Sequence, residues 1–269
     1  MPELERPDVI LHYEVSGTGP PLLMLSGFMS DSASWAPLIP LLEPDFTLIR
    51  PDNQSTGRTR PWNAPASPAI WADDALALLD HLGHRRAHVL GHSLGGNIAW
   101  VLAQDAPSRI ASCTMAASAP IRLNRNTDLF EALIAIRRSD APSETWLRAL
   151  FPWLFAPSVY DLPGAIETAV AQSLGYPHAQ SPEAMAHQLN ALKNADPKPF
   201  ATIPQVPLLA LLAERDLLVP LENAQDALKG ITQQIIPGTG HSVHWDAPDA
   251  VASHLRDFAA KHPIGNDRI

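Results

Sequence analysis

The chain has 269 residues, of which 46% are hydrophobic and 17% are charged, and its formal net charge is −9. This length suits one α/β domain with an insertion, and the low charged fraction argues against long disordered segments. The negative charge argues against nucleic acid and anionic membrane surfaces as main partners.

The cysteine content and the apolar runs indicate where the protein is expected to reside. The single cysteine, Cys113, excludes an internal disulfide and is typical of a reducing compartment. Residues 1–10 lack the apolar core of a signal peptide, and the longest apolar run, residues 207–213, is far shorter than the ~20 residues of a membrane helix. We therefore expect a cytoplasmic protein with no membrane segment; the sequence does not indicate an oligomeric state.

Short β-type runs alternate with helical patterns along most of the chain. We predict strands at residues 12–15, 22–25, 46–49, 88–90, 112–115, 208–212 and 234–237. The helical patterns between and after them cover residues 34–43, 68–83, 97–106, 221–230 and 249–262. This alternation predicts an α/β fold with a mostly parallel central sheet and helices on both faces.

The alternation stops between residues 121 and 199. This stretch has helical patterns at residues 128–138, 143–151, 166–174 and 182–194 and no clear strand. We predict a helical cap at 121–199, inserted into a core formed by 1–120 and 200–269. Aromatic residues of the insertion, Trp153 among them, are interpreted mainly as packing contacts, and Trp153 is also a candidate pocket wall.

The chemistry centres on Gly91-His92-Ser93-Leu94-Gly95, a G-x-S-x-G pattern that follows an apolar run and precedes a helical one. A sharp turn from strand to helix forces the serine into a strained backbone conformation, and glycines two places away avoid steric clashes. The turn exposes the hydroxyl beside a helix N-terminus. Ser93 is therefore predicted to be a nucleophile.

A serine nucleophile needs a base, and the base needs an orienting acid, which in this kind of fold follow in the order serine, acid, histidine. Asp216 comes a few residues after the predicted strand 208–212 and is the favoured acid, with Glu214 as its rival. His241 follows the predicted strand 234–237 and a glycine-containing loop and is the favoured base, with His244 as its rival.

An oxyanion hole requires two N–H donors. The N–H of Leu94, directly after the nucleophile, is one candidate, and the N–H of Phe28, in the loop after the strand at 22–25, is the other. Gly27 is expected to allow a tight turn in that loop. No H-E-x-x-H motif or cysteine cluster is present, so we expect no metal site.

These segments resemble the α/β-hydrolase superfamily over nearly the whole chain. The matching pieces are SGF at 26–28, PDNQSTGRT at 51–59, GHSLGG at 91–96, AERD at 213–216 and GHSVHWDAP at 240–248. The nearest likeness is to the esterase and lactonase branch, which includes 3-oxoadipate enol-lactonases and cofactor-free haloperoxidase-like esterases. The resemblance implies a triad of Ser93, Asp216 and His241 under a helical cap, and no cofactor. Ser26, where the family often has histidine, and Ser55, where a turn glycine is usual, depart from the pattern.

The expected function is that of a serine hydrolase that cleaves a small-molecule carboxylic ester or lactone through an acyl-enzyme on Ser93. Met29, Trp153 and Arg122 are candidate pocket residues; Arg122 and Arg125 would suit a substrate carboxylate, although solvated surface charge explains them as well. Three alternatives stay open: a C–C bond hydrolase of ring-cleavage products, a cofactor-free dioxygenase, and a ligand receptor with residual hydrolase activity. Ser30 stands where the similar dioxygenases carry a histidine, which counts against the second.

Overall fold

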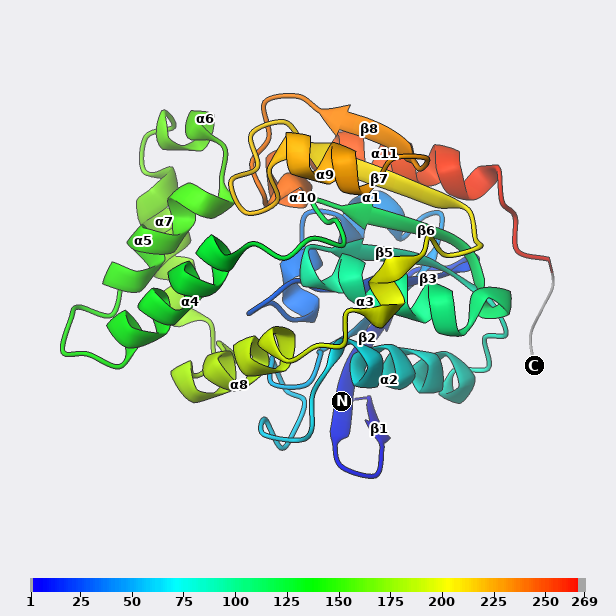
Figure 1. Ribbon diagram of the computed structural model, residues 1–269, viewed down its shortest axis with the longest axis horizontal. Helices are drawn as coiled ribbons and strands as arrows, with labels where there is room; N and C mark the ends of the chain where they lie inside the picture. The colour runs from blue at the N-terminus through cyan, green and yellow to red at the C-terminus, as the bar shows by residue number, and fades with distance from the viewer. Residues whose placement is uncertain (1, 266–269) are drawn as a thin grey trace.

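The computed structural model describes residues 2–265, which form an eight-stranded sheet with helices on both faces (Figure 1). The strand order is β1-β2-β4-β3-β5-β6-β7-β8. β1 pairs antiparallel with β2, β2 pairs antiparallel with β4, and the remaining pairs are parallel. The strands are β1 (Glu3–Glu5), β2 (Ile10–Ser16), β3 (Pro21–Leu25), β4 (Thr47–Pro51), β5 (Ala87–His92), β6 (Ile110–Ala116), β7 (Leu208–Ala213) and β8 (Thr232–Ile236).

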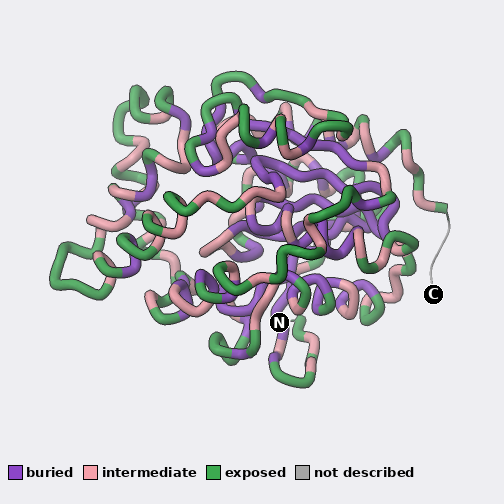
Figure 2. Tube along the Cα trace, in the orientation of Figure 1, coloured by how far each residue is buried: buried purple, intermediate pink, exposed green. Residues whose placement is uncertain are grey.

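The alternation of side chains along each strand supplies both faces of the core. Leu23 and Leu25 of β3 belong to the apolar cluster formed with helices α2 (Pro68–His81) and α3 (Leu94–Asp105). Leu22 and Met24 belong to the cluster formed with α1 (Ile39–Leu42) and α11 (Pro248–Ala260) on the opposite face. The central strands β3, β5, β6 and β7 are therefore buried on both sides, which explains why they read as mostly apolar runs (Figure 2).

The segment between β6 and β7, which is described throughout, contains helices and no strand. Its helices are α4 (Asn124–Arg137), α5 (Thr145–Leu154), α6 (Pro157–Tyr160), α7 (Ala165–Gly175) and α8 (Pro182–Lys193). Four of them correspond to the predicted helical patterns. In Figure 1 the group lies beside one end of the sheet, and we call α4–α8 with their connections the cap.

Three of the helices and strands, β1, α6 and the single-turn helix α10 (Val243–Asp246), were not predicted. β1 has only three residues and two of them are glutamates, so it is too short to give a strand signal and depends on its pairing with β2. α6 is a single turn that starts at Pro157. The remaining elements are the helix α9 (Leu221–Ala227) and short 3₁₀ turns at Ser32–Trp35, Pro107–Arg109 and Lys198–Ala201. None of the helices within residues 2–265 is long and apolar enough to cross a bilayer.

Candidate active site

Ser93 lies at the turn between β5 and α3, where the sequence predicts the nucleophile. Its backbone has φ 52° and ψ −117°, a conformation that non-glycine residues rarely adopt. The N–H of Ser93 donates to the carbonyl oxygen of Ala116 at 3.0 Å, which ties the turn to the end of β6. Such backbone strain persists only where the surrounding structure imposes it. In this conformation the Ser93 side chain faces the cavity.

The two glycines of the motif are required by close backbone approach. A Cβ atom on Gly91 would lie 2.2 Å from the carbonyl oxygen of Gly95, and a Cβ atom on Gly95 would lie 1.8 Å from the carbonyl oxygen of Leu25. Both contacts are far inside van der Waals distance, and both involve main chain that cannot move aside. The glycines thus allow α3 to begin directly against β3 and β5.

We expect Gly95→Ala to lower the free energy of unfolding by more than about 3 kcal/mol, because the new methyl group forces α3 away from β3. Urea unfolding followed by circular dichroism measures this. Gly175→Ala is the matched control, since a Cβ there meets no atom within 4 Å, and it should change stability by less than about 1 kcal/mol. Equal stability of the two variants would contradict the packing argument.

His241 and Asp216 complete a hydrogen-bonded chain with Ser93. The distance between Nε2 of His241 and Oγ of Ser93 is 2.8 Å, and Nδ1 of His241 lies 2.8 Å from Oδ2 of Asp216. The carboxylate only accepts hydrogen bonds, so Nδ1 carries the proton and Nε2 is the acceptor for the serine hydroxyl. Both side chains are buried, with 3% of His241 and 5% of Asp216 exposed.

The loop after β7 holds the carboxylate in place. Oδ1 of Asp216 accepts the backbone N–H groups of Leu218 and Val219, each at 2.8 Å. These bonds fix the plane of the carboxyl group, which leaves Oδ2 directed at the imidazole.

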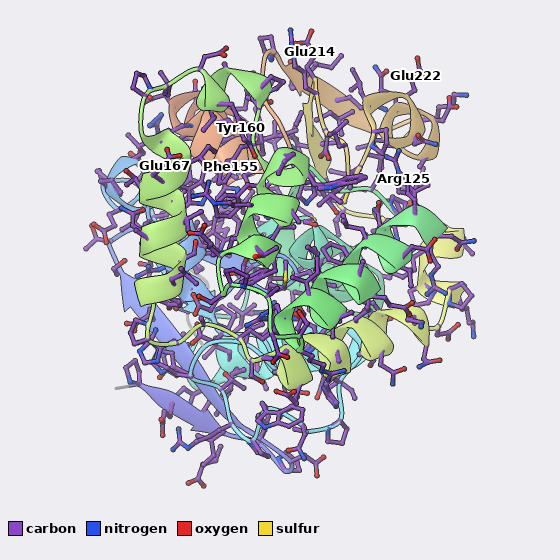
Figure 3. All side chains as sticks on the ribbon, turned by 90° about the vertical axis from the view of Figure 1, so that its left-hand side faces the viewer. Arg125, Phe155, Tyr160, Glu167, Glu214 and Glu222 are labelled. Atoms are coloured by element: carbon purple, nitrogen blue, oxygen red, sulfur yellow. The ribbon has the colours of Figure 1, made fainter. Side chains whose placement is uncertain are left out.

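The two rival residues lie elsewhere. Glu214 is exposed, and its Oε2 accepts the N–H of Gly238 at 2.7 Å; Figure 3 shows it at the periphery of the molecule, apart from Phe155 on the cavity wall. His244 is buried against the rings of Trp35 and His92. Burial lowers the pKa of His244 to about 3, so its imidazole is neutral at pH 7.

Two residues that the sequence analysis did not assign support the loop around His241. Nε2 of His92 donates to the carbonyl oxygen of His241 at 2.9 Å, and burial holds the pKa of His92 well below its usual range. Oδ2 of Asp246 accepts the N–H of Gly240 at 2.7 Å and that of Ala156 at 3.2 Å. Asp246 therefore joins this loop to the cap. Its place in the segment GHSVHWDAP at 240–248, one of the pieces that resemble the superfamily, was the only sequence signal for it.

The candidate oxyanion donors flank Ser93. Within the described residues, the N–H groups of Phe28 and Leu94 donate no backbone hydrogen bond, and both residues share a cavity wall with Ser93. The expectation that Gly27 supplies the turn is wrong: Met29 has the left-handed conformation, with φ 64°. Gly27 is needed because a Cβ there would lie 2.9 Å from Nδ1 of His92.

Comparison with known proteins identifies the family. A family model for the alpha/beta hydrolase fold matches residues 20–248. The chain belongs to the α/β hydrolase fold family. The match confirms the fold class and the superfamily expected from the motifs.

The relatives of this α/β hydrolase include two proteins provisionally named carbamate hydrolase RutD. The one from Variovorax paradoxus is 29% identical over 259 residues, which cover 93% of this chain and 96% of the relative. The one from Azorhizobium caulinodans is 31% identical over 224 residues, which cover 82% of each. The crystal structure of an enol-lactonase from Burkholderia xenovorans has a TM-score of 0.82 at 21% identity and covers 96% of this chain and 100% of that one. This last likeness concerns the fold.

A cavity of about 610 Å³ lies between the core of the hydrolase and its cap. Ser93 and His241 line it together with Met29, one of the predicted pocket residues. The wall that the cap supplies is mostly apolar and includes Phe130, Trp146, Leu147, Leu150, Phe151 and Phe155. The described residues contain no group of three or more His, Cys, Asp or Glu side chains placed to hold a metal ion.

Two of the predicted pocket residues do not line this cavity. Trp153 is half-buried outside it, because its neighbours Leu154 and Phe155 on α5 face the cavity instead. Arg122 is exposed, and its guanidinium donates to the carbonyl oxygens of Leu192 at 2.9 Å and Lys193 at 3.1 Å, at the end of α8. It lines only a second cavity, of about 750 Å³, which also reaches Ser93. The guanidinium of Arg125 hydrogen-bonds to the carbonyl oxygen of Leu217.

Proposed function

We propose that this protein is a serine hydrolase that cleaves a carboxylic ester or lactone through an acyl-enzyme on Ser93. The observation that carries the proposal is the chain of hydrogen bonds from Ser93 through His241 to Asp216, with Ser93 Oγ 2.8 Å from the imidazole. A serine hydroxyl is a weak nucleophile at neutral pH, and this arrangement supplies the base that activates it. The single buried cysteine is compatible with the cytoplasmic location that we propose.

In the proposed reaction, Oγ of Ser93 attacks the carbonyl carbon while Nε2 of His241 accepts the hydroxyl proton. The N–H groups of Phe28 and Leu94 stabilise the negative charge on the carbonyl oxygen. His241 then returns the proton to the alcohol oxygen as the C–O bond breaks. Water attacks the acyl-enzyme by the same route, and Asp216 stabilises the imidazolium at both stages.

Carbamate hydrolysis is a second candidate, and the RutD-named relatives favour it. The chemistry differs only in the acyl group: attack by Ser93 on a carbamate gives a carbamoyl-enzyme, which water must then release. The two candidate functions therefore differ in which covalent intermediate water hydrolyses efficiently, the acyl-enzyme or the carbamoyl-enzyme.

Steady-state turnover separates them. The wild-type enzyme is assayed with p-nitrophenyl butyrate, a γ-lactone and a p-nitrophenyl N-alkylcarbamate. We expect sustained turnover of the ester or the lactone, and with the carbamate a single burst of nitrophenol equal to the enzyme concentration. Sustained turnover of the carbamate alone would favour the second candidate. Absence of turnover and of any burst with all three compounds would refute both.

The cavity also indicates which acyl groups are preferred. Arg137, at the end of α4, is the only arginine or lysine among the described residues that line it. The guanidinium carbon lies 4.4 Å from the ring centroid of Trp146, and Nη2 donates to the carbonyl oxygen of Gln180 at 2.6 Å. The nearby carboxylate of Glu183 pairs with Arg138 instead, at 3.5 Å. Arg137 is thus placed to meet an anionic group of a substrate.

We expect Arg137→Met to lower kcat/KM about tenfold for mono-p-nitrophenyl glutarate and to leave p-nitrophenyl butyrate within about twofold, because a charge-assisted hydrogen bond contributes ~1.5–3 kcal/mol. Arg138→Met is the control, since it removes the adjacent charge, which does not line the cavity. An equal loss for both substrates would show that Arg137 acts only on packing.

A further inference from the structure

The buried side chain of Gln188 joins the cap to residues 27–30, which carry the candidate donor Phe28 and which we call the oxyanion loop. Gln188 of α8 has none of its surface exposed, and its Oε1 accepts the N–H of Met29 at 3.0 Å. The two residues are 159 positions apart in the chain. α8 lies along the lower edge of the cap in Figure 1, next to α4. A helix of the cap therefore contacts the backbone of the residue that follows Phe28.

The orientation of the Gln188 amide is fixed by its neighbours. The N–H of Met29 can only donate, so the oxygen of Gln188 must face it. Nε2 of Gln180 donates to the same oxygen at 3.1 Å and to the carbonyl oxygen of Ser55 at 2.7 Å. Because a carbonyl oxygen only accepts, the Gln180 amide is also fixed. The two glutamines thus form one directed network from the core to the oxyanion loop.

The loop needs this support because of its conformation. Residues 27–30 form a turn in which the N–H of Ser30 donates to the carbonyl oxygen of Gly27 at 3.2 Å. Met29, the third residue, has φ 64° whereas Phe28 does not have a positive φ, which is the pattern of a type II turn. That turn favours glycine at the third position, and a residue with a side chain favours type I. The two types differ by rotating the peptide between Phe28 and Met29 through roughly half a turn.

We propose that Gln188 is a positioning residue: it anchors the Phe28–Met29 peptide in the type II orientation and so holds in place the turn that carries the N–H of Phe28, a group of the adjoining Gly27–Phe28 peptide. In the rotated peptide, the carbonyl oxygen of Phe28 would face Oε1 of Gln188, and two acceptors would meet. The cap thus completes the oxyanion hole as well as forming the wall of the cavity. This inference rests on the proposed function, in which Phe28 supplies one of the two donors.

The test compares Gln188→Met, which removes the acceptor at similar size, with Gln188→Glu, which keeps an acceptor oxygen. With p-nitrophenyl butyrate, Gln188→Met should lower kcat about 10- to 100-fold and leave KM within about twofold, because losing one oxyanion donor typically costs ~100- to 1000-fold and the loop is only partly displaced. Gln188→Glu should keep kcat within about threefold of the wild-type value. The rate of inactivation by a fluorophosphonate should fall in parallel with kcat.

His187→Phe is the matched control, because Nδ1 of His187 bonds the hydroxyl of Ser55 at 2.9 Å from the same helix without touching the oxyanion loop. It should keep the wild-type kcat. If Gln188→Met does not fold, Gln188→Asn withdraws the oxygen by one methylene and should show the same loss of kcat.

Each outcome decides the matter. Wild-type kcat in Gln188→Met, a change in KM alone, or an equal loss in His187→Phe would overturn the positioning role while the proposed function stands. A wild-type enzyme that turns over none of the esters, lactones or carbamates would overturn the proposed function, and this inference with it.

Discussion

Ser93→Ala is expected to lower kcat/KM for p-nitrophenyl butyrate by about 10⁴-fold or more, because it removes the oxygen that His241 activates in the proposed mechanism. The residual rate would come from the oxyanion donors acting on water. The measurement compares initial rates of matched preparations of the wild-type enzyme and the variant. Their melting temperatures show that both are folded. Retention of more than a tenth of the wild-type turnover would mean that another group performs the attack.

Asp216→Asn is expected to lower kcat by about 10⁴-fold, the loss seen when a triad aspartate elsewhere becomes an amide. The reason lies in the loop after β7. The N–H groups of Leu218 and Val219 both donate to Oδ1, so the amide oxygen of the variant must take that place. The amide nitrogen then occupies the position of Oδ2, 2.8 Å from Nδ1 of His241. It donates to Nδ1, moves the imidazole proton to Nε2, and leaves no acceptor for the serine hydroxyl.

Glu214→Gln is the control for this variant. It is two residues away, carries the same change of charge, and lies on the surface, where Oε2 accepts only the N–H of Gly238 among the described residues. We expect it to keep kcat within about twofold. A loss in Glu214→Gln comparable to that in Asp216→Asn would show that net charge in this region, rather than the tautomer of His241, controls the rate.

Much of the fold follows from local sequence signals. The core strands are buried on both faces and therefore read as apolar runs, as β3 and β7 do. β1 could not be predicted, because only one of its three residues is apolar and its extended form depends on the register with β2. The place of the cap over the sheet also depends on contacts between distant segments, such as the N–H of Ser242 donating to the carbonyl oxygen of Leu154 at 2.8 Å.

The candidate site, like the fold, could be predicted from the sequence only in part. Ser93, Asp216 and His241 follow strands of one sheet, so their order along the chain already places them at a common edge. The sequence alone does not separate Asp216 from Glu214, because the difference arises from the turn that directs two N–H groups at Asp216. Gln188 carries no sequence signal, since its role depends on a single atom of the backbone at Met29. Trp153 was wrong as a wall of the cavity beneath the cap, because the rotation of α5 decides which of its side chains face that cavity. Arg122 lines the second cavity at Ser93 instead.

The most direct test of the account is to find which atom reacts with an active-site probe. The wild-type enzyme and His241→Ala are incubated with a fluorophosphonate, digested, and examined by tandem mass spectrometry. We predict one label per chain, on Ser93, and a rate of labelling that falls by at least about 1000-fold in His241→Ala, since the imidazole accepts the proton of the attacking hydroxyl. A label on any other residue, or an unchanged rate in His241→Ala, would contradict the claim that His241 activates Ser93.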